Sequence, residues 1–316
     1  MLGGRDPTWC RGRRAREAPE PPIEACYSPV TVIAPNCHLG AGQPMLHAMR
    51  DTVRHRALQV RTRADRGLAA LPRFVQGFRY GRALAAAPPP PPQVFAEADN
   101  PLRRYFESHA SGDGITKWSH YFDIYHRHFA KFAGTPVNIL EVGVYSGGSL
   151  QMWRDYFGEG CTVYGVDIEP SCRAYAGDGV EIFIGDQADP RFWQRILREV
   201  PALDIVVDDG GHETEQQVVT LEALLPHLRP GGVYLCEDVT DFGNPFHAYI
   251  AGLAENLHDR TPISPGVMGP NGLQQLIEAI HIYPYVTVIE RTTGPRPPFV
   301  SDRRGTQWQQ FTSGRM

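Results

Sequence analysis

Residues 141–149 have the sequence Glu141-Val142-Gly143-Val144-Tyr145-Ser146-Gly147-Gly148-Ser149. The apolar run 137–144 predicts a buried strand that leads into this stretch, and a helical pattern at 149–157 follows it. Glycines between a strand and a helix let the backbone turn sharply and approach a ligand closely. The turn lacks the G-x-G-x-x-G spacing of nicotinamide-cofactor sites, so such a cofactor is the weaker alternative.

Further strands and helices alternate on the C-terminal side of this turn. Apolar runs predict strands at 162–168, 180–186, 203–209, 231–239 and 285–292, and an edge strand in the tail at 303–311. Helical patterns occupy 188–200, 214–228 and 271–284. Alternating strands and helices form βαβ units. The sequence therefore predicts an α/β fold: a Rossmann-like, doubly wound, mostly parallel seven-stranded sheet with helices on both faces.

The composition divides the chain at a proline run. Residues 1–98 form one predicted region, low in complexity and disordered, with a basic helix within 45–84 and a polyproline linker at Pro88–Pro92. Residues 99–316 form the predicted catalytic domain. Its first helix is expected at 117–132, where aromatic side chains share one stripe that serves either a cofactor lid or an interface in a homo-oligomer.

Three strand ends point toward one nucleoside. The glycine turn closes the first strand, Asp167 ends the second, and Asp186 with Gln187 follows the third. An acidic residue at the end of the second strand can accept both hydroxyls of a ribose, and a polar pair after the third is expected to face an adenine. We therefore expect Gly143, Ser146, Gly147, Asp167, Asp186 and Gln187 to border a nucleoside cofactor.

Carboxylates and one histidine follow the next two strands. Asp208, Asp209 and His212 close the fourth strand, and Glu237 and Asp238 close the fifth. Carboxyl ends of adjacent parallel strands share one crevice, and clustered carboxylates repel each other unless a cation lies between them. Hard oxygen ligands favour Mg²⁺ or a similar ion, and a neutral imidazole can accept a hydroxyl proton. The simpler alternative is that the carboxylates cap helices and that His212 is a surface residue.

The charge distribution limits the partners. Residues 1–98 hold 14 basic and 7 acidic residues (+7), whereas the rest of the chain holds 17 basic and 28 acidic residues (−11). An acidic catalytic domain argues against nucleic acid as the substrate. No apolar run reaches the roughly 18–20 residues that span a bilayer, so we expect no stable membrane insertion and a cytoplasmic location.

The motifs GGSLQMW, VDDGGH and RPGGVYLCEDV, together with KWSHYFDIYHRHF and the terminal GTQW, resemble class I S-adenosylmethionine-dependent methyltransferases. Within that class they resemble the macrocin and mycinamicin type of antibiotic-sugar O-methyltransferases and a related cephalosporin hydroxylase-like group. The resemblance covers about Asn100 to Phe311.

It implies Mg²⁺-dependent transfer of a methyl group from S-adenosylmethionine to a hydroxyl of a sugar or glycosylated natural product. It also assigns roles to residues. Asp209, Glu237 and Asp238 would hold the metal, His212 would be the general base, and Asp208 would lie near the sulfonium. The cofactor would be lined by Glu141, Gly143, Ser146, Asp167 and Gln187.

Two other functions use the same pattern. One is a hydroxylation, although redox iron sites usually have two histidines and one carboxylate, unlike the predicted cluster. The other is a non-catalytic module that binds S-adenosylmethionine.

Overall fold

The computed structural model describes residues 71–86, 99–239 and 244–307. The chain divides into two compact units, residues 1–94 and 95–316. In the first unit, residues 71–85 are helical. The rest of the predicted disordered region, most of the predicted basic helix and the polyproline linker lie outside the described residues. Among the helices that the structure describes, none is both long and apolar enough to cross a bilayer.

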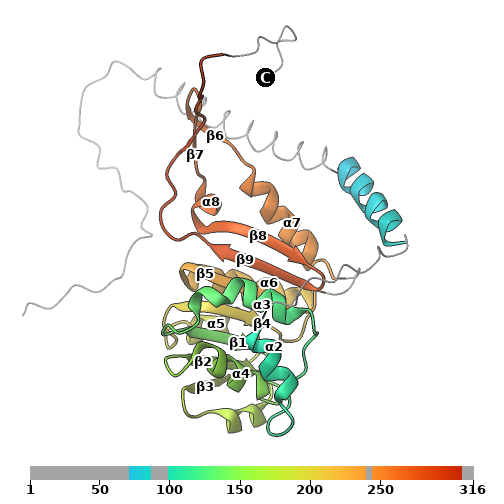
Figure 1. The fold of residues 1–316 in the computed structure, drawn as a ribbon, viewed down its shortest axis with the longest axis vertical. Helices are drawn as coiled ribbons and strands as arrows, with labels where there is room; N and C mark the ends of the chain where they lie inside the picture. Colours follow the sequence, from blue (N-terminus) through green and yellow to red (C-terminus); the bar gives the residue numbers. More distant parts are fainter. Residues whose placement is uncertain (1–70, 87–98, 240–243, 308–316) are drawn as a thin grey trace, which may run out of the picture. The chain divides into compact units, whose positions relative to one another are not determined.

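A seven-stranded sheet organises the second unit (Figure 1). Its order is β3-β2-β1-β4-β5-β9-β8. Strands β1 to β5 are parallel, and β9 runs antiparallel to both β5 and β8. The strands are β1 (Asn138–Val142), β2 (Thr162–Asp167), β3 (Val180–Ile184), β4 (Leu203–Asp208), β5 (Leu228–Cys236), β8 (Ile277–Tyr283) and β9 (Val286–Arg291). This is the predicted mostly parallel sheet, and the Rossmann-like fold class is confirmed.

Helices cover both faces of the sheet because side chains alternate along each strand (Figure 1). On β1, Ile139 belongs to the core on one face and Leu140 to the core on the other. The first core contains side chains from α2 (Pro101–Ser108), α3 (Tyr121–Phe129) and α4 (Gly148–Phe157). The second contains side chains from α5 (Pro190–Ile196), α6 (Thr214–Leu224) and α7 (Phe246–Leu257).

The predicted helix over 271–284 is wrong. Only α8 (Gly272–Leu276) is helical, and the chain then enters β8. The apolar residues of 277–283 suit either period over so short a run, and pairing with β9 decides for the strand. The predicted tail strand is also absent from residues 303–307, and residues 308–311 lie outside the described part of the chain. A small separate sheet instead joins β6 (Thr261–Ser264), β7 (Val267–Gly269) and β10 (Phe299–Val300).

The turn between β1 and α4 has two glycine positions with no room for a side chain. Gly143 has φ 92°, and a Cβ placed there would collide with the backbone carbonyl of Asp209. Gly147 has φ 77°, and its Cβ would meet the ring of Tyr175. The turn therefore lies directly against the end of β4, which brings the nucleoside-facing and carboxylate-bearing strand ends together.

We expect Gly143→Ala to destabilise the fold by at least about 1–3 kcal/mol, because alanine is strained at positive φ and its Cβ has no room. Urea unfolding measures the change. The control is Gly252→Ala, within helix α7, where nothing lies within 4 Å of the added Cβ. That substitution is expected to raise stability by roughly 0.5–1 kcal/mol. Equal effects of the two substitutions would contradict the conclusion that position 143 has no room for a side chain.

Candidate functional site

A cavity of about 380 Å³ opens at the carboxyl ends of the parallel strands. Eight of the predicted site residues line it: Gly143, Ser146, Asp167, Asp186, Gln187, Asp209, His212 and Asp238. Glycine-turn residues and the carboxylate–histidine residues thus border the same space. Ligand pockets usually occupy this position in open α/β sheets.

On the side of the cavity that is predicted to face a nucleoside, polar side chains accept hydrogen bonds from the backbone. The Asp167 carboxylate accepts hydrogen bonds from the amides of Val144 and Tyr145, each at 2.9 Å. Gln187 is buried, and its side-chain oxygen accepts a 2.8 Å hydrogen bond from the amide of Gly211. These contacts fix the two loops that would face a cofactor before any ligand arrives.

Four predicted residues do not line the cavity. Glu141 is buried and accepts a hydrogen bond from the Ser149 hydroxyl. The Asp208 side chain lies on the face of the sheet that packs against the second core. There it accepts hydrogen bonds from Tyr234 and Gln187. The other two are Gly147 and Glu237. A direct cofactor contact for Glu141, Gly147 and Asp208 stays a prediction, and their observed contacts suit a positioning role.

Asp208 is completely buried, and this burial raises the pKa of its carboxyl group to about 7. Strand alternation explains its direction, because Asp208 has the same parity on β4 as Val206 and thus faces the second core.

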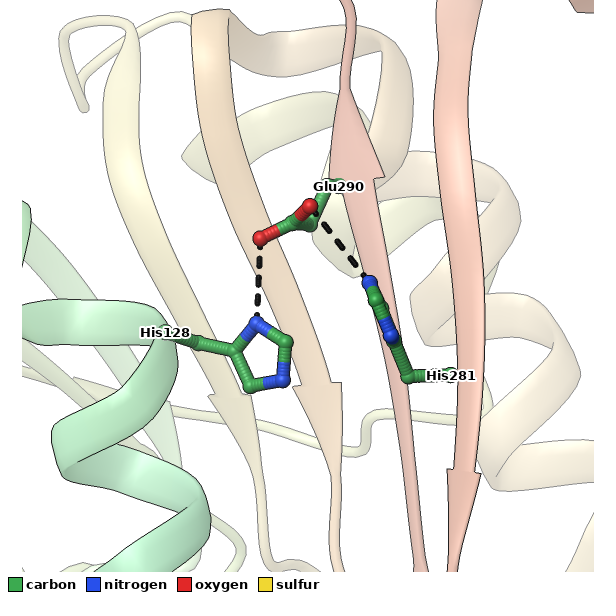
Figure 2. A group of neighbouring side chains, drawn as sticks. All are labelled: His128, His281 and Glu290. Carbon is green, nitrogen blue, oxygen red and sulfur yellow. Dashed lines mark hydrogen bonds and ion pairs between the residues drawn. The ribbon is translucent and has the colours of Figure 1, made fainter.

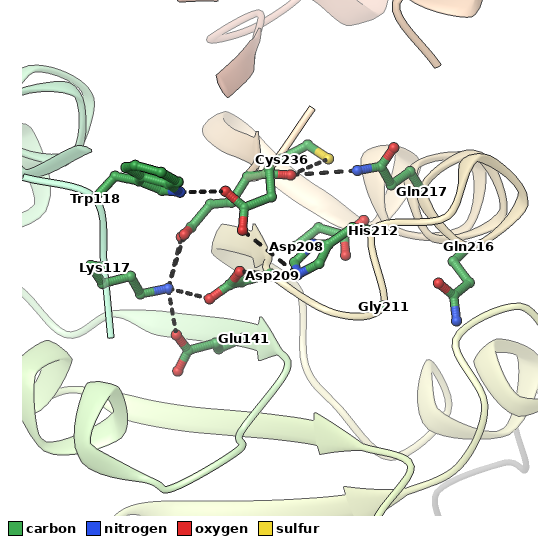
Figure 3. A network of polar contacts seen from close by, with 12 residues as sticks. Lys117, Trp118, Glu141, Asp208, Asp209, Gly211, His212, Gln216, Gln217 and Cys236 are labelled. Atoms are coloured by element: carbon green, nitrogen blue, oxygen red, sulfur yellow. Dashed lines mark hydrogen bonds and ion pairs between the residues drawn. The ribbon is translucent and has the colours of Figure 1, made fainter. Parts of the chain in front are cut away.

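A lysine that the sequence interpretation missed lies at the centre of the carboxylates (Figure 3). The Lys117 Nζ atom is 2.5 Å from Asp209 Oδ2 and 3.0 Å from both carboxylate oxygens of Glu237. It is also 3.8 Å from Glu141 Oε1, and its side chain is only 3% exposed. Burial alone would lower the pKa of Lys117, but Glu237, Asp209 and Glu141 outweigh it and raise the pKa, so the ammonium stays charged.

Because the sequence predicted one helix over 117–132, Lys117 was not recognised as part of the site. The structure begins α3 only at Tyr121, and Lys117 lies in the segment before it, which has no regular secondary structure. Composition offered one signal. The chain has 31 basic residues, and only Lys117 and Lys131 are lysines. The lysine ammonium is a compact charge with three donors, so it can bond two carboxylates at once.

Helix α3 holds the remaining carboxylates in place. The Tyr121 hydroxyl donates a 2.5 Å hydrogen bond to Asp238 Oδ1, which also accepts one from the Trp118 indole. The Tyr125 hydroxyl donates a 2.6 Å hydrogen bond to Glu237 Oε1. Burial raises the pKa of both tyrosines, with the neighbouring carboxylates adding to the shift, so both remain hydrogen-bond donors.

Two carboxylate oxygens at the cavity accept no hydrogen bond from the residues that the structure describes. Asp209 Oδ1 and Asp238 Oδ2 lie 4.0 and 3.7 Å from His212 Nε2 (Figure 3). One ligand atom from each of these three residues lies within 4.8 Å of the others. A divalent cation fits this donor set. Glu237 belongs to it less directly than predicted, because Lys117 and Tyr125 already bond its carboxylate.

Backbone strain is concentrated at this cavity. Tyr145, His212 and Asp238 have φ values of 49°, 61° and 52°, a region that residues other than glycine rarely adopt. Each such conformation costs of order 1–3 kcal/mol and persists where the surrounding structure enforces it. Strain at three cavity residues supports a functional role for this site.

The chain is similar to known methyltransferases. Residues 140–239 match a family model described as a methyltransferase domain. The chain is 31% identical over 211 residues to 8-demethyl-8-(2-methoxy-alpha-L-rhamnosyl)-tetracenomycin-C 3'-O-methyltransferase of Streptomyces olivaceus, an alignment that covers 60% of this chain and 53% of that protein. It is 32% identical over 200 residues to demethylmacrocin O-methyltransferase of Streptomyces fradiae. This alignment covers 55% of this chain and 50% of that protein.

A solved structure is also similar. MycE methyltransferase from the mycinamycin biosynthetic pathway, in complex with Mg, SAH and mycinamycin VI, matches with a TM-score of 0.50 and 28% identity. The match covers 63% of this chain and 55% of that one. The resemblance to macrocin- and mycinamicin-type O-methyltransferases that the motifs indicated is confirmed. The chain spans about half the length of the curated relatives it matches.

We expect Lys117→Met to lower the free energy of unfolding by about 3–5 kcal/mol in the presence of a chelator, because it leaves buried carboxylates without their counter-charge. Burial raises the pKa of Glu141 and Glu237, so these groups take up protons as the pH falls. The loss should therefore shrink between pH 8 and pH 5, roughly where raised carboxyl pKa values lie. Urea unfolding at several pH values measures it.

Lys131→Met is the matched control because Lys131 is exposed. This change is expected to alter stability by less than about 0.5 kcal/mol. A loss of similar size in both variants, or one independent of pH, would show that Lys117 does not neutralise the carboxylates.

Proposed function

We propose that this chain is an S-adenosylmethionine-dependent O-methyltransferase that acts on a sugar hydroxyl of a glycosylated small molecule, with Mg²⁺ as its metal. One observation carries the proposal: a single cavity is bordered by the Gly143 turn and Asp167 on one side and by Asp209, His212 and Asp238 on the other. Both relatives are named as O-methyltransferases, and the name of one includes a rhamnosyl group on tetracenomycin C, which supports the same reaction.

The reaction needs alignment and removal of one proton. An oxygen–carbon bond forms between the acceptor hydroxyl and the methyl carbon while the sulfur–carbon bond breaks, which gives a methyl ether and S-adenosylhomocysteine. We assign the proton to His212 Nε2, because His212 lines the cavity beside Asp209 and Asp238 and a positioned imidazole can accept a hydroxyl proton. Holding the reactants in line contributes several kcal/mol of the roughly 7–11 kcal/mol that positioning can supply.

The cation would be held by Asp209 Oδ1 and Asp238 Oδ2. Bound Mg²⁺ supplies Lewis acidity that lowers the pKa of an acceptor hydroxyl. Mg²⁺ prefers oxygen ligands and keeps several waters, so His212 stays available as the base. The Lys117 ammonium contacts Asp209 through Oδ2 only, and the Oδ1 atom of Asp209 and the Oδ2 atom of Asp238 are left as two oxygen donors for a divalent ion.

His212→Ala is expected to reduce kcat by roughly 10²–10⁴-fold, the usual contribution of a positioned general base. Binding of S-adenosylmethionine should stay within a few-fold of wild type, since the nucleoside contacts lie on the other strand ends. Mass spectrometry of product from isotope-labelled cofactor gives the rate, and calorimetry gives the affinity. Unchanged turnover would remove His212 from the mechanism.

Asp209→Asn and Asp238→Asn are expected to weaken Mg²⁺ activation by at least about tenfold, because each removes a charged oxygen ligand. Asp155→Asn, an exposed carboxylate on α4, is the control and should leave the Mg²⁺ dependence unchanged. The readout is rate against Mg²⁺ concentration with acceptors that lack one sugar O-methyl group. Full activity in chelator would exclude the metal.

A further inference from the structure

A second group of metal-ligand side chains lies outside the cavity, at the other end of helix α3. His128 is on α3, His281 is on β8 and Glu290 is on β9 (Figure 2). One ligand atom from each lies within 4.8 Å of the others. None of the three residues lines the 380 Å³ cavity. We propose that these three side chains form a Zn²⁺ site that fastens α3 to the antiparallel edge of the sheet.

The distances suit a small ion with nitrogen and oxygen ligands. His128 Nδ1 lies 3.0 Å from Glu290 Oε1, and His281 Nε2 lies 3.4 Å from Glu290 Oε2. Zn²⁺ bonds nitrogen and carboxylate oxygen at about 2.0–2.2 Å, which separates tetrahedral ligand atoms by about 3.3 Å. The Glu290 carboxylate already stands between the two imidazoles, so small side-chain rotations bring the three donors around one ion.

The protonation states also suit a metal. Burial is the main reason that the pKa of His128 falls, so its imidazole is neutral and keeps a lone pair. Burial would raise the pKa of Glu290, but hydrogen bonds from His128 and His281 and the charge of Lys131 lower it, so its carboxylate is ionised. Two imidazoles and one carboxylate are a common donor set for zinc with one water.

Tyr283 supplies the supporting contact that metal-bound histidines usually have. Its hydroxyl lies 2.9 Å from His128 Nε2. Without an ion, the Tyr283 hydroxyl donates to Nε2 while Nδ1–H donates to Glu290. With an ion on Nδ1, the proton moves to Nε2 and is donated to the Tyr283 oxygen. Such a partner orients the ring and fixes its tautomer.

The location of the three side chains on helix α3 and the sheet edge indicates what a bound ion would do. Tyr121, Tyr125 and His128 follow one another along α3 at spacings of four and three residues, which places them on one face of the helix. The two tyrosines hold Asp238 and Glu237, and His128 reaches Glu290. An ion at the far end would fix the axial position and rotation of the helix that positions the catalytic carboxylates. The proposal itself does not depend on the methyl-transfer reaction.

Two histidines and one carboxylate are also the ligand set of non-haem iron oxygenases. This set does not line the cavity where a substrate would bind. The structure therefore favours a positioning ion over a redox centre.

The test uses the full chain, stripped with a chelator and then held in excess Mg²⁺ so that the carboxylate site is filled. We expect about one equivalent of Zn²⁺ to bind and to raise the unfolding temperature. Co²⁺ in its place should give the visible absorption of a nitrogen-ligated ion. His281→Ala and Glu290→Gln should each weaken binding by more than the roughly 10–100-fold that loss of a supporting contact costs, and Tyr283→Phe should fall within that range.

His258→Ala removes an exposed histidine and should leave Zn²⁺ binding unchanged, and so should Asp238→Asn in the cavity. Glu290→Gln keeps the test valid if His281→Ala fails to fold. Binding that survives both ligand variants, or the absence of any Zn²⁺-dependent rise in unfolding temperature, would overturn the proposal and leave a hydrogen-bonded histidine–glutamate pair.

Discussion

The ammonium group of Lys117 is the contact on which the site depends. It joins Asp209 at the end of β4, Glu237 at the end of β5 and Glu141 near the end of β1. Like-charged carboxylates on neighbouring strand ends would repel each other in so buried a place. One cation at their centre lets three strand ends converge while Asp209 and Asp238 line the cavity. The Lys117 ammonium thus neutralises the buried side of the carboxylate cluster. The side that faces the cavity remains available to a ligand.

Helix α3 connects this cluster with the antiparallel edge of the sheet. Most of its length is apolar packing on the first core, yet three of its polar side chains bond acidic residues after β5 or on β9. Several charge-assisted hydrogen bonds therefore fix the position of this helix together. A shift of this helix would move two carboxylates together, so the geometry of the site and the packing of the core are linked.

Sequence patterns predicted most of the scaffold and eight of the cavity residues, because five buried strands and the glycine turn give strong local signals. The direction of Asp208 was also predictable, since a residue two positions after Val206 on a strand shares its face. Two features were not. Lys117 acts through contacts with residues 24, 92 and 120 positions away, which no local pattern encodes. Strand β8 exists because β9 offers an edge, whereas its own residues suit a helix equally well.

The left-handed backbone at Tyr145, His212 and Asp238 has an evolutionary consequence. Glycine would relax all three positions, but it would also delete the side chain that borders the cavity. Thermal robustness and chemistry therefore pull in opposite directions at these residues. A lineage, or a laboratory selection, that rewards only heat tolerance is expected to lose them early, and their retention in a distant homologue would mark a cavity still under selection for use.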